Sequence, residues 1–227
     1  NISVILYFTL IEFLSVSIFY GTSLPLILAK NSVFPLLFAG YDKAVVYGLV
    51  LVILPLGQFL LTPLWGQLSD VYGRKIILFL TLLGSAFAYL VMAVAISGHV
   101  FGLFILGRVL SAMLAANLAI GQASLADMTG EQSKAARFNL QFITISLGFI
   151  LGPYLISMTT HDVNYANIYW VIAIGYVLAF VFVSRFYTET LAVISKEPIQ
   201  WLRNISRIFT IFKQPELKGL FIQKNIK

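Results

Sequence analysis

Residues 66–75 read Gly-Gln-Leu-Ser-Asp-Val-Tyr-Gly-Arg-Lys, and this short polar stretch separates two long apolar runs, residues 44–65 and 76–97. About 20 predominantly apolar residues are what an α-helix needs to cross a membrane. Two such helices joined by so short a connection must reverse direction sharply, and Gly66 and Gly73 supply backbone freedom and close approach for that turn. The stretch therefore predicts a helical hairpin across a membrane.

The composition of the whole chain agrees with a membrane protein. Hydrophobic residues make up 59% of the 227 residues and charged residues 11%, and the mean hydropathy is +0.92, which exceeds what a soluble domain needs for one core. None of the long apolar runs shows the ten-residue alternation of a membrane β-barrel. We predict an all-α polytopic membrane protein with six transmembrane helices, at residues 4–29, 44–65, 76–97, 101–124, 138–158 and 166–187.

Lysine and arginine indicate the orientation of these helices. The connections after the second, fourth and sixth helices carry Arg74, Lys75, Lys134, Arg137, Arg185 and Lys196. Those after the other three carry only Lys30 and Lys43. By the positive-inside rule the first set is cytoplasmic, so both ends of the chain are expected inside, in a bacterial inner (plasma) membrane. The first apolar run is too long for a cleaved signal peptide, and the chain, Asn1 to Lys227, is expected to be a fragment.

Several function classes are excluded by what the sequence lacks. There is no cysteine, and the two histidines, His99 and His161, fall in different loops without acidic partners at ligand spacing, so no metal site is expected. The net charge of +6 is dispersed through loops, which argues against nucleic acid as a partner. No nucleophile with a base and no phosphate-binding glycine loop is present, so the protein is not expected to be an enzyme and needs no cofactor.

The chain is expected to divide into three parts. Residues 1–187 form the six-helix bundle. Residues 188–216 form a cytoplasmic linker whose apolar side chains recur at helical spacing, as in a helix lying on the inner leaflet; they are Ile199, Leu202, Ile205, Phe209 and Phe212. Residues 217–227 resemble the start of a seventh membrane-spanning helix.

The stretch 66–75 resembles the signature of the major facilitator superfamily: glycine, any, leucine, small, aspartate, basic, any, glycine, arginine, lysine or arginine. The resemblance implies the first half of a twelve-helix fold, made of two inverted three-helix repeats, with a missing C-terminal six-helix half as partner. It also implies a conformational latch formed by Gly66, Asp70, Gly73, Arg74 and Lys75. From chemistry alone, Asp70 can accept hydrogen bonds from Arg74 or from a helix N-terminus. The alternative is an ordinary solvated, positively charged loop.

Two further stretches resemble the drug and proton antiporter branch of this family. Gly148, Gly152 and Pro153 resemble its fifth-helix motif; the glycines allow close helix packing and the proline allows a bend. The alternative is a purely structural packing site. Residues 188–191, Thr-Glu-Thr-Leu, resemble the boundary after the sixth helix of exporters. Residues 126–129 with Arg137 resemble the fourth-to-fifth loop.

Apart from Arg185, which is counted with the connection after the sixth span, two formal charges fall inside the predicted spans, Glu12 and Arg108. Each costs at least ~2.5 kcal/mol near the bilayer centre, so each is expected to face a cavity or a partner. Glu12 shares a helix face with Ser15, Phe19, Thr22 and Ser23, and Arg108 with Ser111, Ala112, Ala115, Ala119 and Gln122. Asn117 falls opposite Arg108 and is expected to be a packing contact. Glu12 and Arg108 resemble proton- and substrate-handling groups of exporters; the alternative is a structural ion pair.

Together these features predict a secondary transporter with protons as coupling ion and a small-molecule substrate. Export of amphiphilic drug-like compounds by alternating access is the expected activity. Proton-coupled uptake of an amino acid, sugar or organic anion, with Arg108 binding the anion, is an alternative within transport. A truncated membrane protein that packs against partners without transporting anything is the alternative outside it.

Overall fold

The computed structural model describes residues 1–29, 33–34, 42–128, 131–158 and 164–191, and over these the regular elements are all helices. The helices are α1 (Ile2–Leu28), α2 (Lys43–Tyr72), α3 (Arg74–Ser97), α4 (Phe101–Leu114), α5 (Asn117–Asp127), α6 (Glu131–Met158) and α7 (Tyr165–Phe186). Within the described ranges, six segments are long and apolar enough to cross a membrane, with α4 and α5 together forming the fourth. The predicted linker and seventh helix lie outside the described residues, apart from the first few residues of the linker.

Two of the helices, α2 and α7, begin where a short side chain accepts a hydrogen bond from a free backbone N–H group. The Ala44 N–H donates to Asp42 Oδ1 (2.9 Å) at the start of α2, and the Ala166 N–H donates to Asn164 Oδ1 (3.0 Å) at the start of α7. Such caps stabilise a helix N-terminus by about 1 kcal/mol. They fix the start of the second and sixth spans within a residue or two of the predicted positions.

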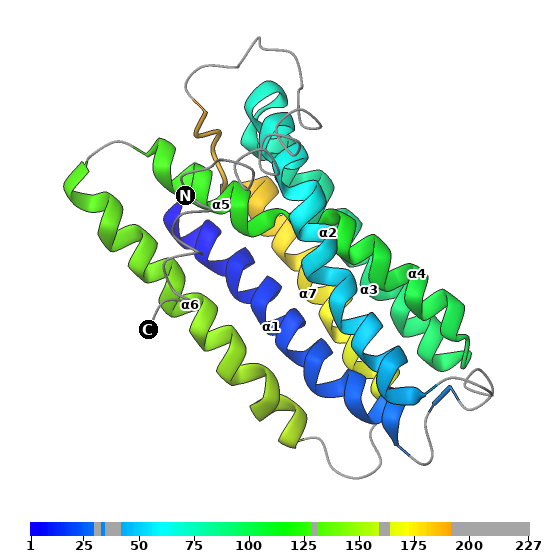
Figure 1. Cartoon of the computed structure of the whole chain (residues 1–227). Helices are drawn as coiled ribbons and strands as arrows, with labels where there is room; N and C mark the ends of the chain where they lie inside the picture. Colours follow the sequence, from blue (N-terminus) through cyan, green and yellow to red (C-terminus); the bar gives the residue numbers. More distant parts are fainter. Residues whose placement is uncertain (30–32, 35–41, 129–130, 159–163, 192–227) are drawn as a thin grey trace, which may run out of the picture.

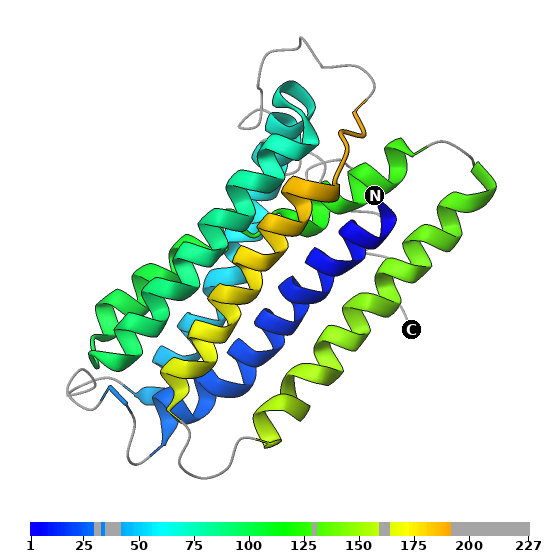
Figure 2. The same cartoon turned by 180° about the vertical axis from the view of Figure 1, so that it is seen from behind.

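The helices pair in a pattern that repeats between the two halves of the bundle. α1 packs along α6 and α7, while the fourth span packs along α2 and α3; α3 and α7 pack against each other. This is the pattern expected if α1–α3 and α4–α7 are two equivalent three-span units. Figures 1 and 2 show α7 lying between α3 and α1, with α6 on the outer side of α1.

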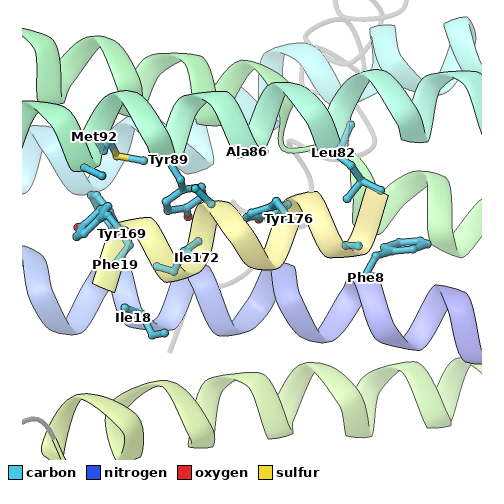
Figure 3. Close-up of a cluster of buried hydrophobic side chains, with 14 of the residues drawn as sticks. Phe8, Ile18, Phe19, Leu82, Ala86, Tyr89, Met92, Tyr169, Ile172 and Tyr176 are labelled. Atoms are coloured by element: carbon cyan, nitrogen blue, oxygen red, sulfur yellow. The ribbon is translucent and has the colours of Figure 1, made fainter. Parts of the chain in front are cut away.

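The core lies between α1, α3, the fourth span and α7. Figure 3 shows labelled side chains of α1, α3 and α7 gathered around α7. The labelled buried residues are Phe8, Ile18, Phe19, Leu82, Ala86, Tyr89, Met92, Tyr169, Ile172 and Tyr176. Three of them are tyrosines, whose hydroxyl groups need partners when they are buried, and this requirement shapes the site described below.

Large apolar side chains cover the outward faces of α2 and α6. On α2, Leu49 and Val52 are more than half exposed, and on α6 so are Phe142 and Ile150. Apolar surface of this extent is stable against lipid or another protein and not against water. The bundle is therefore a multi-pass membrane protein unit.

The two ends of the bundle meet. Asn1 Nδ2 donates to the Thr188 carbonyl oxygen (3.1 Å), and the Thr188 N–H donates to Asn1 Oδ1 (2.9 Å). The Thr188 hydroxyl group adds a third bond to Asn1 Oδ1 (3.0 Å). The start of α1 is thereby fixed to the segment that leaves α7.

Candidate functional site

Arg108 is the most deeply buried cation of the described chain, with no exposed surface. Its guanidinium carbon lies 3.5 Å from the centre of the Phe19 ring and 6.0 Å from that of Tyr20. None of its three guanidinium nitrogens completes a hydrogen bond. A cation held by aromatic faces in this way is stabilised by about 2 kcal/mol when desolvated, but its N–H donors stay free for an acceptor.

Glu12 of α1 is 3% exposed and lies nearer the end of the bundle that holds Asn1. Its carboxyl group faces the side-chain amide of Asn117 and the backbone N–H of Leu118 at the start of α5. Glu12 Oε2 and Asn117 Nδ2 remain without a hydrogen-bond partner, while Asn117 Oδ1 accepts from Thr81 (2.6 Å). The acid therefore lies at the N-terminus of a helix, where a negative charge is favoured.

The N-terminus of α5 lies within the fourth span because this span is broken. Ala115 leaves helical geometry with φ −77° and ψ 60°, and the Ala116 N–H bonds back to the Leu114 carbonyl at 2.8 Å. Figure 1 shows α5 leaving α4 at an angle. The expected face of Asn117, opposite Arg108 on a continuous helix, is wrong, because the break turns Asn117 toward Glu12. The packing contact expected of Asn117 is confirmed by its bond to Thr81 of α3.

Glu12 and Arg108 do not contact each other, and no ion pair joins them among the described side chains. The alternative of a structural ion pair is thus wrong for this structure. Both side chains are enclosed within the bundle and do not line an open cavity. The predicted polar face of α1 is confirmed in position, since Ser15, Thr22 and Ser23 are all buried with Glu12.

A series of tyrosines connects the regions of the two charges. Tyr176 of α7 hydrogen-bonds Ser15 (2.9 Å) and stacks on Tyr89 of α3, with ring centres 5.4 Å apart. Tyr169, one heptad before Tyr176, hydrogen-bonds Thr22 (3.1 Å) and lies 6.2 Å from Tyr89. These tyrosines are not among the predicted site residues, although the seven-residue spacing of Tyr169 and Tyr176 within a membrane helix indicates a shared face.

An apolar pocket lies beside this series of tyrosines, between α1, α6 and α7. It has a volume of about 330 Å³ and a single polar side chain in its lining, Ser15, which also bonds Tyr176. The other lining residues are Ile11, Leu14, Ile18, Leu155, Ile156, Ile168, Val171, Ile172 and Gly175. Apolar space thus adjoins the buried polar groups.

A second cluster of charges lies at the end of the bundle that holds Asn1, around Arg74. The Arg74 guanidinium group bonds Asp70 (2.7 Å), Asp127 (3.1 Å) and the Ser69 hydroxyl group (2.6 Å). These bonds connect α3 to the last turn of α2 and to the end of α5. The predicted bond between Asp70 and Arg74 is confirmed. Asp127 is an additional partner, and it belongs to residues 126–129, which resemble the fourth-to-fifth loop of the family.

Glu189, from the segment after α7, caps the N-terminus of α3. Its carboxylate accepts from the backbone N–H groups of Arg74 (3.2 Å) and Lys75 (3.0 Å). Burial opposes its ionisation, but the N–H groups of Lys75, Leu191, Thr190 and Arg74 more than offset this and lower the pKa of Glu189. The carboxylate is thus held ionised at the positive end of α3.

The sharp turn between α2 and α3 is made at Gly73. Its φ of 97° is a conformation that glycine adopts without strain, and a Cβ here would lie 2.8 Å from Glu189 Oε2. The expectation that Gly66 also lies at the turn is wrong, because α2 continues through it to Tyr72. Beyond the adjoining backbone of its own helix, no described atom lies within 4 Å of its Cβ position. The side chain of Lys75 lies over the Phe79 ring (5.6 Å).

Gly148 and Gly152 lie where α6 crosses α1. A Cβ on Gly148 would come within 2.8 Å of Phe13 Cβ, and one on Gly152 within 2.6 Å of Ser17 Cβ. Pro153 follows inside α6. The predicted close packing at these glycines is confirmed for this pair of helices.

Among the residues that the structure describes, no group of three or more His, Asp or Glu side chains could hold a metal ion. The buried Glu12 carboxyl group and Arg108 guanidinium group are groups that can bind ions, protons or polar ligands.

Comparison with known proteins identifies the family. The sequence profile described as the Major Facilitator Superfamily matches residues 5–222. The chain belongs to this superfamily. This confirms the family to which the stretch 66–75 pointed.

The relatives include bacterial drug-resistance proteins. The class G tetracycline resistance protein of Vibrio anguillarum is 38% identical over 109 residues, which are 48% of this chain and 27% of that protein. The class B protein of Escherichia coli is 29% identical over 152 residues, 67% of this chain and 37% of its own length. Human major facilitator superfamily domain-containing protein 10 is 31% identical over 115 residues, 51% of this chain and 25% of that protein.

Solved structures agree on the fold. The crystal structure of the human organic anion transporter MFSD10 (TETRAN) has a TM-score of 0.70 at 21% identity, and the match covers 88% of this chain and 50% of that one. A peptide transporter, POT, in complex with alafosfalin has a TM-score of 0.58 at 18% identity, covering 95% of this chain and 46% of the other. The chain spans about half the length of these transporters.

Proposed function

We propose that the intact protein is a secondary transporter that exports amphiphilic, drug-like compounds in exchange for protons. The observation that carries this proposal is the buried Glu12, whose Oε2 has no partner. An acid enclosed in a membrane protein is costly and is retained where it handles ions or protons. The resemblance to tetracycline resistance proteins over about half of the chain supports the drug class.

The surroundings of Glu12 suit an amphiphilic substrate. The apolar pocket between α1, α6 and α7 touches Ser15, which is bonded to the tyrosine series next to Glu12. A ligand with an apolar body and one polar group would find both environments within one helix turn of α1. The substrate would be bound between this bundle and a second six-helix half, near the midplane of the membrane.

The orientation follows from the basic loops. Arg74, Arg137 and Arg185 lie after the second, fourth and sixth spans, so we place this end of the bundle, with Asn1 and Thr188, in the cytoplasm of a bacterial cell. The cluster of Asp70, Arg74 and Asp127 would then act as the cytoplasmic latch between conformations.

Uptake of an organic anion is a second proposal, and Arg108 favours it. Three guanidinium donors without acceptors, fully enclosed, are suited to a carboxylate or phosphate group. The fold similarity to a protein described as an organic anion transporter is compatible with this substrate class.

A flux assay in proteoliposomes separates these proposals. The intact protein is tested with an imposed proton gradient and a panel containing tetracycline, other amphiphilic cations and organic anions. Drug export that Glu12→Gln abolishes and that Arg108→Lys weakens supports the exporter. Anion flux that Arg108→Gln abolishes supports the second proposal. Absence of flux for every compound, in well-folded protein, would contradict both and favour a non-transporting role.

A further inference from the structure

The break between α4 and α5 leaves backbone groups that a continuous helix would pair. In an uninterrupted helix, the Met113 carbonyl would accept from the Asn117 N–H, and the Leu114 carbonyl from the Leu118 N–H. Here the Leu114 carbonyl is taken by Ala116 (2.8 Å). Unpaired backbone groups at membrane depth are costly, so other residues must compensate.

Two side chains from other helices provide this compensation. The indole Nε1–H of Trp65, on α2, donates to the Met113 carbonyl (2.6 Å). The carboxyl group of Glu12, on α1, faces the Leu118 N–H. Trp65 of α2 therefore bonds a carbonyl group that the break leaves free, and Glu12 of α1 faces an N–H group that the break leaves free. Neither alanine at the break, Ala115 or Ala116, favours a bend by itself, because alanine is the best helix former.

The broken form replaces backbone hydrogen bonds of the span with contacts from other helices. Straightening would restore the bonds from residues 116–119 to residues 112–115, and it would release the bonds of Trp65 and Ala116 and the contact of Glu12 with the Leu118 N–H. The charge on Glu12 then decides between the forms, because an ionised carboxylate at a helix N-terminus is stabilised by the dipole and a neutral one is not.

We infer that the break in the fourth span is a two-state element: ionised Glu12 holds it open, and protonation of Glu12 lets α4 and α5 join into one helix. Glu12 and Trp65 are its positioning residues. This inference rests on the proposed function, since it assumes that Glu12 exchanges a proton during transport.

The other groups that face Glu12 do not replace it in this role. The titratable ones are Tyr89 of α3 and Tyr176 of α7, which are phenols, while Arg108 of α4 forms no ion pair with it. From α6 the neighbouring contribution is the uncharged Gln141, which donates to Thr9 (3.4 Å), one turn before Glu12. Glu12 is thus the one carboxyl group at the break among the described residues.

Straightening the span would also act on the latch. α5 begins at Asn117, beside Glu12, and ends at Asp127, the partner of Arg74. The two ends of α5 are about 15 Å apart at 1.5 Å per residue. A change in the direction of α5 moves Asp127 relative to Arg74. The protonation of a mid-membrane acid is thereby coupled to the charge cluster at the end of the bundle.

Distance measurement between spin labels tests this inference. The chain has no cysteine. Cysteines introduced at the exposed positions Leu106 and Ala126 would therefore be its two spin-labelled sites, one on α4 and one on α5. The intact protein in lipid nanodiscs is measured by double electron–electron resonance at alkaline and at acidic pH. Acidification is expected to lengthen the distance toward the ~30 Å that twenty residues of continuous helix span.

Three variants sharpen the test. Glu12→Gln, which mimics the protonated acid, and Trp65→Phe, which removes the indole donor, are expected to give the longer distance already at alkaline pH. Asp42→Asn is the matched control, since it also changes a helix-capping acid to its amide but on α2, and it should behave as the unchanged protein. Size-exclusion profiles show whether each variant is folded. If Glu12→Gln does not fold, the pH series of the protein without a substitution at Glu12 still tests the inference.

The outcomes separate this inference from the proposed function. A distance that does not change with pH, or a pH response that persists in Glu12→Gln, overturns the two-state element. If Glu12→Gln loses proton-driven flux without any change in distance, the transport proposal stands and the inference fails. If the distance responds as expected but no proton-coupled flux is found, the proposed function fails and the conformational control by Glu12 stands.

Discussion

The hydroxyl group of Ser17 on α1 donates a hydrogen bond to the backbone carbonyl oxygen of Phe149 on α6, at 3.1 Å. In a regular helix this carbonyl would accept from the N–H of residue 153, which is a proline and has no N–H. A neighbouring helix therefore supplies the donor that the proline removes. This bond lies between the crossing points of Gly148 and Gly152, where the two backbones are close.

Replacement of Ser17 by alanine should destabilise the bundle by about 1 kcal/mol, because it leaves a carbonyl without a donor. The change is measured as a lower thermal unfolding temperature in detergent. Pro153→Ala restores the missing N–H, so Ser17→Ala should cost less in that background. Equal costs in both backgrounds would contradict the assigned pairing.

Alanine at Gly148 should destabilise the bundle by about 1–3 kcal/mol, because its Cβ would press on the backbone of α1, 3.0 Å from the Leu14 nitrogen. The control is Gly66→Ala, which has open space around its Cβ position and gains helix propensity of up to about 1 kcal/mol. Thermal unfolding of the two variants side by side checks the prediction. If Gly66→Ala lowers the unfolding temperature and Gly148→Ala does not, the assignment of close helix packing to Gly148 is wrong.

The cap of Glu189 on α3 predicts a specific pH dependence of stability. Because the folded state lowers the pKa of this carboxyl group, the ionised form stabilises the fold, and the contribution is complete above its ordinary pKa. It is lost as the pH falls through the lowered folded-state value. The unfolding temperatures of the unchanged protein and of Glu189→Gln should therefore converge under acid. If the difference in unfolding temperature between the two proteins stays constant as the pH falls, the ionised Glu189 carboxylate is not its cause.

Part of the contribution of Phe19 to stability should come from its contact with Arg108. Phe19→Leu keeps an apolar side chain but removes the aromatic face under the guanidinium group, so a loss of about 2 kcal/mol is expected. Phe19→Tyr keeps the face and serves as the control. A double-mutant cycle compares the loss of unfolding free energy caused by Phe19→Leu in the unchanged protein and in Arg108→Met. Equal losses would show that the contact between Phe19 and Arg108 does not stabilise the fold.

The six spans could be predicted from the sequence because each depends on local composition. The positions of Glu12 and Arg108 inside spans, and of Asp70 beside Arg74, followed from the same reasoning and from helix periodicity. The prediction for Gly66 is wrong because the polar residues after it are typical of a loop, whereas α2 continues to Tyr72.

The break at Ala115 and Ala116 could not be predicted, because no glycine or proline marks it. Its cause lies in contacts from other helices, Trp65 and Glu12, which are distant in sequence. The same break moved Asn117 from its expected face. Sequence periodicity assumes an unbroken helix, and it fails where tertiary contacts replace the backbone bonds.

The bonds between Asn1 and Thr188 have a mechanical consequence. The segment after α7 is hydrogen-bonded to the start of α1 through Thr188 and to the start of α3 through Glu189. A pull on that segment is delivered to two spans at once, one of them the helix that bears Glu12. Those two spans would then tilt together rather than separately.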